Sequence, residues 1–373
     1  MEKRVSASYC GEIDFWKFIC CIIIVVHHSF QIFGERIYMG AGSTCVEFFF
    51  IVSGFLTASS VARKNQKFES DKIGTQTVDF LFHKIKGFLS CYIFAVVSCL
   101  AARIITEGLS KTILNENFAL SIVDLLLLNS SGLPHWYIFS ASWYLSAMLL
   151  GLAVIYPIMR KNRDLFLNII APLTAIVLYS VMLKKDGYIG DPDKWYYIVT
   201  KGFLRSIAGL CLGSTAYALC ERIKKIENKR SVGVLFTLLE FAVMAFAIFA
   251  LYRNKHNLAP TVIFAFFVCV VISASNMSLT APIFNRPIFA LLGKLSMSVY
   301  LCHQTVAYII GYVITSYGSP HKLLIESNPG VRPFYLIIYV LDSVLLGIIC
   351  LAVCSAISKR IKKRRENKPI DEA

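Results

Sequence analysis

Three ionisable residues near the start of the chain have the types and the spacing needed for acid–base chemistry. Lys17 and His28 lie eleven residues apart in one apolar segment, and Glu47 lies in the next. At about 100° per residue, that spacing turns a helix about 20° past three full turns and separates the two by about 16 Å along its axis. They therefore share one face. His27 lies about 80° off that face, so His28 is expected to act with Lys17.

Glu47 and His28 are each about six residues from the same end of their segments, so we predict that they lie at equal depth and contact each other. A carboxylate there would fix the imidazole tautomer and stabilise its protonated form. Asp14 lies one turn before Lys17 and is predicted to pair with it. Ser53-Gly54 would lie near the middle of the second apolar segment, where small residues permit close helix approach.

Each of the three residues also has an interpretation without chemistry. Lys17 could extend its ammonium group to the inner interface, and His28 could be a packing residue with satisfied hydrogen bonds. A carboxylate in a Phe-rich stretch needs a partner or a cavity, so Glu47 is harder to explain by packing alone. The three together, on adjacent helices, favour a functional site.

The composition indicates a membrane protein. Of the 373 residues, 56% are hydrophobic and 16% are charged, and the mean hydropathy is +0.62. Soluble domains carry about 25% charged residues. The net charge of +15 could suggest nucleic acid, but the basic residues cluster between apolar runs, as in cytoplasmic loops of membrane proteins. We therefore expect membrane lipids around the protein and no nucleic-acid partner.

Ten apolar segments are long enough to cross a bilayer, which requires about 20 residues per helix. The predicted fold class is all-α, a polytopic bundle of transmembrane helices in a single domain, 1–358, followed by a basic, disordered tail, 359–373. The apolar run 118–129 is interrupted by Asp124 and is expected to be re-entrant or interfacial. The expected spans are 14–33, 41–62, 87–105, 137–159, 165–183, 203–220, 232–252, 259–275, 294–316 and 334–357.

The distribution of basic residues orients the predicted bundle. With a cytoplasmic N-terminus, clusters of Lys and Arg at 63–86, 160–163, 222–230 and 359–368 all fall on the cytoplasmic side, and the opposite loops carry far fewer. Cytoplasmic loops carry the excess of Lys and Arg, so both termini are predicted to be cytoplasmic. No cleavable signal peptide is expected, because the first apolar run lacks a small-residue cleavage site.

Most of the 12 cysteines lie inside apolar runs, where a thiol behaves as a small hydrophobe. No CxxC pair or regular spacing indicates a metal site or a disulfide framework. Neither is predicted.

The segment 12–17 with His28, and the segment 46–56, together resemble the motifs of the acyltransferase-3 family, membrane O-acyltransferases that acylate sugars of bacterial envelope polysaccharides. The family shows a basic residue, usually Arg, then ten residues, then His. Here the basic position is Lys17, and lysine lacks the planar bidentate grip of arginine. The second motif of the family begins with a valine and an acidic residue. Two phenylalanines follow after one further residue, and Ser-Gly-Phe follows after two more; the segment 46–56 matches this order.

The resemblance extends over nearly the whole chain. Segments that agree with the family are 82–86, 142–145, 156–157, 205–213 and 292–303.

The resemblance also implies further substrate-binding residues, each with a simpler alternative. Lys84 and Lys86 could bind the phosphates of a CoA donor, although a role as positive-inside anchors is favoured. Trp143 could stack on a sugar, although a place in the interfacial aromatic belt is favoured. Arg205 could meet an acceptor phosphate or extend to the interface. His303 is a second candidate for the site, with a packing role as the alternative.

The implied reaction is transfer of an acyl group, most often acetyl, from a cytoplasmic acyl-CoA to a hydroxyl of an envelope or extracellular polysaccharide or its lipid-linked precursor. His28 would be the base and later the acid, oriented by Glu47. Lys17 would attract the donor by charge, with Asp14 and Ser53 among the substrate-binding residues. Acyl-CoA is then a co-substrate, with no bound cofactor, and the protein lies in the bacterial inner membrane.

Two alternatives remain open from the sequence. A transporter or flippase-like protein for an envelope precursor would also have ten helices and buried charges. An inverted-repeat transporter should show matching halves, which this sequence lacks. A structural partner in a polysaccharide-assembly complex would use Lys17, His28 and Glu47 only for packing.

Overall fold

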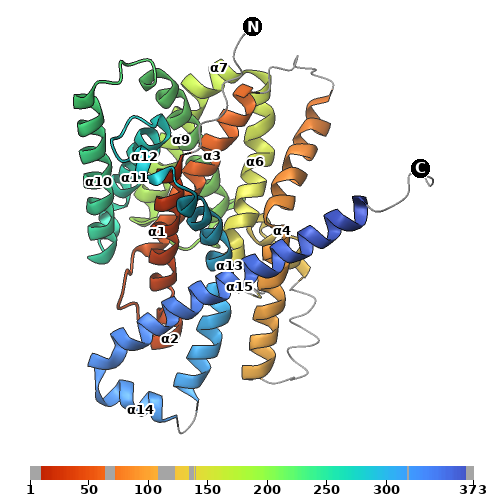
Figure 1. The fold of residues 1–373 in the computed structure, drawn as a ribbon, viewed down its shortest axis with the longest axis vertical. Helices are drawn as coiled ribbons and strands as arrows, with labels where there is room; N and C mark the ends of the chain where they lie inside the picture. Colours follow the sequence, from red (N-terminus) through yellow and green to blue (C-terminus); the bar gives the residue numbers. More distant parts are fainter. Residues whose placement is uncertain are drawn as a thin grey trace, which may run out of the picture.

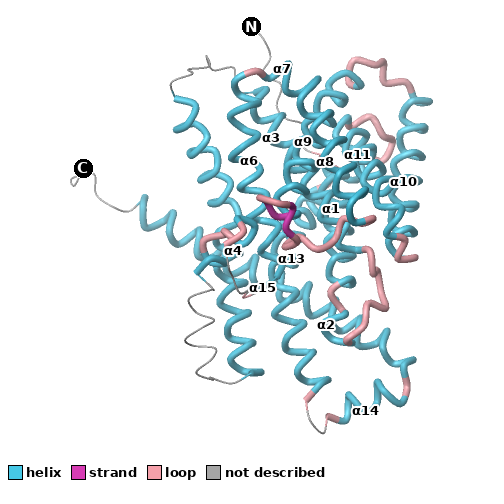
Figure 2. Tube along the Cα trace, turned by 180° about the vertical axis from the view of Figure 1, so that it is seen from behind, coloured by secondary structure: helices cyan, strands magenta, loops and turns pink. Residues whose placement is uncertain are grey.

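The computed structural model describes residues 10–63, 72–107, 122–133, 138, 140–316 and 319–366 of the chain. The described part is a bundle of long helices (Figure 1) with one short strand pair (Figure 2). The strands β1 (Trp195–Tyr196) and β2 (Val199–Thr200) are antiparallel, with Trp195 opposite Thr200.

The helices of the described ranges differ widely in length. In chain order they are α1 (Gly11–His27), α2 (Phe30–Phe33), α3 (Cys45–Arg63), α4 (Ile73–Glu107), α6 (Trp143–Lys161), α7 (Arg163–Leu165), α8 (Ala171–Asp186), α9 (Lys201–Ile223), α10 (Arg230–Tyr252), α11 (Ala259–Ser275), α12 (Ala281–Phe284), α13 (Pro287–Thr315), α14 (Pro320–Ser327) and α15 (Arg332–Glu366). Short 3₁₀ turns lie at Gly42–Thr44, Asn129–Ser131, Ser140–Ser142, His256–Leu258 and Pro329–Val331, and Phe166–Ile170 is a π-helical turn.

Ten helical segments in the described ranges are long and apolar enough to cross a membrane, which confirms the predicted fold class. Each overlaps one of the predicted spans. They are Gly11–Phe33, Gly42–Arg63, Ile73–Thr106, Ser140–Lys161, Arg163–Asp186, Lys201–Ile223, Arg230–Tyr252, His256–Ser275, Pro287–Thr315 and Pro329–Ile361.

Two sequence-based expectations need correction or completion. Helix α15 continues to Glu366, so the prediction of a disordered tail from 359 is wrong for residues 359–366; Lys, Arg and Glu are good helix formers. Residues 64–71 and 367–373 lie outside the described residues. The expected interfacial segment 118–129 is described only from Ile122, where one helical turn to residue 125 holds the fully buried Asp124.

Small residues let α3 and α9 pack closely. A methyl group added at Gly54 would lie 2.1 Å from the carbonyl oxygen of Leu210, and one at Gly213 would lie 1.9 Å from that of Ile51. Neither backbone can yield without moving a whole helix. The Ser53-Gly54 position therefore serves the close approach that the sequence predicted, and this crossing fixes the helices that carry the buried charges described below.

Substituting Gly213 by Leu is expected to separate α3 from α9 and to destabilise the protein by at least the 1–3 kcal/mol or so that an overpacked core costs. Gly87→Leu on α4 is the matched control, since a Cβ at Gly87 meets nothing within 4 Å. Thermal unfolding of both detergent-purified variants, followed by size-exclusion chromatography, measures the difference. Equal melting temperatures would contradict the packing argument.

Candidate active site

A large cavity lies at the end of the bundle where α1 finishes. Its volume is about 510 Å³, and it is lined by the end of α1, the starts of α3, α6 and α9, the connection 186–193 and Tyr300 of α13. Histidines, arginines, aspartates and aromatic rings all face it. Mixed polar and aromatic walls around a cavity of this size are typical of a small-molecule site.

His28 lines this cavity and is held in a defined tautomer. Its Nδ1 lies 2.8 Å from the carbonyl oxygen of Ile24. A carbonyl can only accept, so Nδ1 carries the proton and the neutral ring keeps the lone pair on Nε2. Nε2 is therefore the atom that can act as a base. The backbone of its own helix, rather than a carboxylate, orients the ring.

Two further histidines surround His28. The ring centroid of His303 lies 4.9 Å from that of His28, and the His303 Nδ1 lies 2.6 Å from the carbonyl oxygen of Tyr300. His303 is fully buried, and its Nε2 has no hydrogen-bond partner among the described residues. His27 also lines the cavity, although its helical position predicted otherwise, with Nδ1 2.8 Å from the Met39 carbonyl oxygen.

Glu47 is paired with Arg205 and not with His28. The Arg205 Nε donates to Glu47 Oε1 at 2.6 Å, and the Tyr179 hydroxyl donates to Oε2 at 2.5 Å. The predicted contact between His28 and Glu47 is therefore wrong. Equal depth in the membrane was not sufficient, because the rotation of α3 turns the carboxylate toward α8 and α9.

Arg205 connects this ion pair to the cavity wall. Its side chain is 1% exposed, its Nη2 donates to the Ser43 carbonyl oxygen at 3.2 Å, and its guanidinium lies 4.8 Å from the Trp143 ring centroid. Arg205 and Trp143 both line the cavity. The Arg205 Nη1 is buried and lacks a hydrogen-bond partner among the residues described.

A second buried charge network fixes the connection that closes the cavity. Asp186 accepts from Lys201 Nζ at 2.6 Å, from Lys194 Nζ at 2.6 Å and from the Tyr196 hydroxyl at 2.7 Å. Burial, together with the Asp186 carboxylate, raises the pKa of Tyr196, so its hydroxyl remains a donor. Lys201 also donates to the carbonyl oxygen of Tyr188 at 2.9 Å. These bonds tie the connection 186–193 to the start of α9.

A small second cavity lies nearer the end of the bundle at which α1 begins. Its volume is about 50 Å³, and Lys17, Phe49, Tyr144, Met297 and Tyr300 are among its lining residues. The ammonium group of Lys17 lies 2.9 Å from Asp14 Oδ1, which confirms the predicted pair. A Cβ at Gly293 of α13 would collide with that Asp14 carboxylate, so glycine makes room for the pair.

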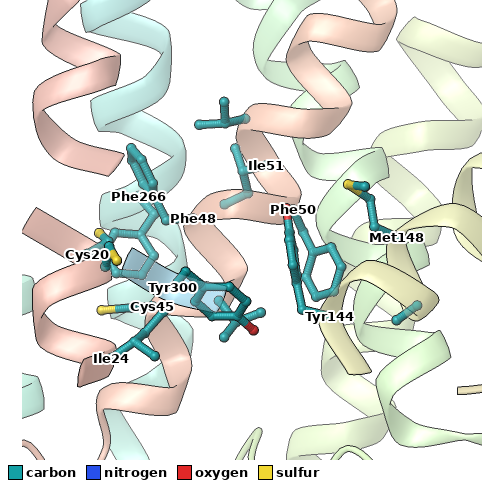
Figure 3. Close-up of a cluster of buried hydrophobic side chains, with 14 of the residues drawn as sticks. Cys20, Ile24, Cys45, Phe48, Phe50, Ile51, Tyr144, Met148, Phe266 and Tyr300 are labelled. Carbon is teal, nitrogen blue, oxygen red and sulfur yellow. The ribbon is translucent and has the colours of Figure 1, made fainter. Parts of the chain in front are cut away.

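Tyr300 lines both cavities. Its hydroxyl donates to the carbonyl oxygen of Ala141 at 2.9 Å, which fixes the ring across the bundle. Its centroid lies 5.8 Å from that of Tyr144, and Figure 3 shows it between Ile24 on one side and Tyr144 on the other. One buried ring thus forms part of the wall between the small cavity and the space beside His28.

Five predicted substrate-binding residues line neither cavity: Asp14, Ser53, Lys84, Lys86 and His303. Ser53 contacts the hydroxyl of Tyr144 at 3.3 Å and so touches only the back of the small cavity. Lys84 lies over the Phe80 ring, with 5.5 Å from Nζ to the centroid, and Lys86 is exposed on the same helix. Trp143 is 9% exposed and lines the large cavity, which contradicts the favoured place in an interfacial belt.

Sequence reasoning missed several residues of the site. Tyr300 lies within the segment 292–303 that agrees with the family, but its sequence context predicts no role for it. Tyr179 carries no sequence signal, because its partner lies 132 residues away. The connection 186–193 has a concentration of Asp and Gly with Tyr188, which could have marked it as a loop with polar side chains available for binding.

The fold and the site together define a multi-pass membrane protein with a polar cavity, a histidine cluster and a buried ion pair. The chain belongs to the acyltransferase-3 family, whose model, described as an acyltransferase domain, matches residues 11–359. It is therefore a membrane acyltransferase, acting on groups other than amino-acyl groups. Neither the curated proteins nor the solved structures include a match to this chain.

Removing Glu47 alone is expected to destabilise the protein by about 3–5 kcal/mol, since it leaves the Arg205 guanidinium buried without a counter-ion. The double variant Glu47→Leu/Arg205→Leu is expected to lose less than the sum of the two single variants. Thermal unfolding of the three purified variants and the wild type completes the cycle. Additive losses would show that the two side chains are energetically independent.

Proposed function

We propose that this protein transfers a short acyl group, acetyl in the first instance, from acyl-CoA to a hydroxyl of an envelope glycan. The observation that carries the proposal is that Tyr300 lines both cavities, beside His28 and His303. The small cavity would receive the acyl end of the donor, and the large cavity would receive the acceptor. Membership of the acyltransferase-3 family supports the reaction type.

The charge distribution supports a cytoplasmic position for the end of the bundle at which α1 begins. Basic residues concentrate in the connections on that side, at 160–163 and 222–230. The small cavity then lies toward the cytoplasm, where acyl-CoA is made, and the large cavity faces outward, toward the glycan. We place the protein in a bacterial inner membrane.

The chemistry follows from the tautomer of His28. Its Nε2 would take the proton of the acceptor hydroxyl as the oxygen attacks the thioester carbonyl carbon. The carbon–sulfur bond then breaks, and the protonated imidazole returns its proton to the departing CoA thiolate. Ester and CoA thiol are the products, and the histidine ends in its starting form. His303, in ring contact with His28, would hold that ring in place while its charge changes.

The small cavity supports a short acyl chain. A water-sized group needs about 10–15 Å³ of cavity volume, so the small cavity of about 50 Å³ holds roughly three to five groups of that size. That is the size of an acetyl thioester end. Lys17, neutralised by Asp14, would contact this end by hydrogen bonding more than by net charge. Lys84 and Lys86 remain candidates for the CoA phosphates only at the membrane surface.

The large cavity supports a hydroxyl-rich acceptor. Carboxylates accept hydrogen bonds from hydroxyl groups, and Asp191 and Asp193 line this cavity together with the rings of Trp143 and Tyr188. Arg205, whose charge Glu47 already balances, would contribute its Nη1 as a hydrogen-bond donor. An acceptor sugar presents hydroxyl groups to all of these.

Replacing His28 by Gln is expected to reduce acyl transfer by about 10²–10⁴-fold, the usual contribution of a general base. Membranes from cells expressing wild type or variant are incubated with radiolabelled acetyl-CoA, and label in the envelope polysaccharide is counted at equal protein levels. His321→Gln is the matched control, because His321 bonds the Tyr335 hydroxyl away from both cavities.

Label that falls in His28→Gln and persists in His321→Gln supports the proposal. Equal label in both variants would remove His28 from the mechanism. The transporter alternative would be favoured by two results together. The wild type would transfer no label, and envelope precursor would accumulate on one side of the membrane in cells that lack this protein.

A further inference from the structure

Three thiols from two helices meet away from both cavities. Cys350 and Cys354 of α15 lie one turn apart on the same face, and Cys91 of α4 lies opposite them. Their sulfur atoms all lie within 4.8 Å of one another. No other group of three or more His, Cys, Asp or Glu side chains in the described ranges comes together in this way.

A fourth thiol adjoins this group. Cys302 of α13 lies next to Cys350. The cluster therefore joins α4, α13 and α15, and all twelve cysteines of the chain are free thiols. Sequence spacing could not reveal the group, because Cys91 and Cys350 are separated by most of the chain and form no CxxC pair.

We propose that Cys91, Cys350 and Cys354 bind one thiophilic metal ion of the zinc type. Three sulfur atoms that lie within 4.8 Å of one another are at most about 2.8 Å from a common centre, and zinc–thiolate bonds are about 2.3 Å long. Side-chain rotations that move each sulfur atom by about half an ångström would therefore bring all three to bonding distance from one metal ion.

The surroundings favour a particular charge state. Cys350 is fully buried and Cys354 is 7% exposed, so an uncompensated thiolate is costly there. A thiol that ligates the metal does so as a thiolate, so binding through all three would release three protons. The divalent ion would offset two of the three negative charges formed. Soft sulfur ligands select zinc, cadmium or copper(I) over magnesium or calcium.

The site would hold the last spanning helix in place. Only 22% of the most apolar stretch of the span Pro329–Ile361, which contains most of α15, is buried inside the protein. This is the smallest share among the ten spans in the described residues. Figure 1 shows α15 crossing the bundle obliquely over α13 and α4. A metal bound to both α4 and α15 would fix that crossing. It would also steady α13, in which Cys302 directly precedes His303 of the site.

Cadmium binding to the purified full-length protein in detergent tests the proposal. The chelator-treated protein is titrated with Cd²⁺, and thiolate-to-cadmium ultraviolet absorption and bound metal are measured, with thermal unfolding at each ratio. Wild type is expected to bind about one equivalent more than Cys350→Ser and than Cys91→Ala, and to melt at a higher temperature with the metal. Cys220→Ser, which removes a buried thiol of α9, is the matched control and should behave as wild type.

Binding that is equal in wild type, Cys350→Ser and Cys91→Ala would overturn the proposal, as would no binding by a monodisperse wild type. In either case the three thiols serve only as small packing groups. Using both Cys350→Ser and Cys91→Ala keeps the test valid if one of them fails to fold. The test needs no acyl transfer, so it stands whether or not the proposed function holds.

Discussion

The ion pair between Glu47 and Arg205 places two opposite charges where almost no water reaches them. Glu47 is fully buried and Arg205 is 1% exposed, so each depends on protein partners for its hydrogen bonds. Glu47 accepts from Arg205 and the Tyr179 hydroxyl, and Arg205 donates to Glu47 and the Ser43 carbonyl oxygen. The 2.6 Å contact requires α3 and α9 to lie close together, which Gly54 and Gly213 permit. The rest of the cavity wall follows from this crossing, since Arg205 also holds Trp143 and the Ser43 carbonyl oxygen.

With that wall fixed, α1 and α13 supply the reacting groups. His28 is oriented by the backbone of its own helix and adjoins His303, while Tyr300 separates the space beside them from the small cavity with Lys17. The two ends of α1 therefore serve two cavities. This arrangement gives a physical meaning to the eleven-residue spacing of Lys17 and His28: one residue faces each side of the same aromatic wall.

The sequence could predict what depends on local pattern. The ten apolar spans, the Lys17–Asp14 pair and the close-packing role of Gly54 follow from helix geometry and hydropathy, and the structure agrees. The partner of Glu47 could not be predicted, because Arg205 lies 158 residues away and only the rotation of α3 decides between it and His28. Trp143 was misplaced for a similar reason: hydropathy gives its depth, but whether it faces lipid or the cavity depends on how α6 packs.

The central claim is that one acyl group passes between two cavities on opposite sides of the Tyr300 ring. Sealed proteoliposomes test it most directly, with envelope oligosaccharide enclosed and radiolabelled acetyl-CoA outside, after activity on the same oligosaccharide has been established in detergent. The account predicts that the enclosed glycan becomes labelled while the vesicles remain impermeable to acetyl-CoA. Label that appears only when donor and glycan are enclosed together would contradict it, because donor and acceptor would then reach the histidines from the same side.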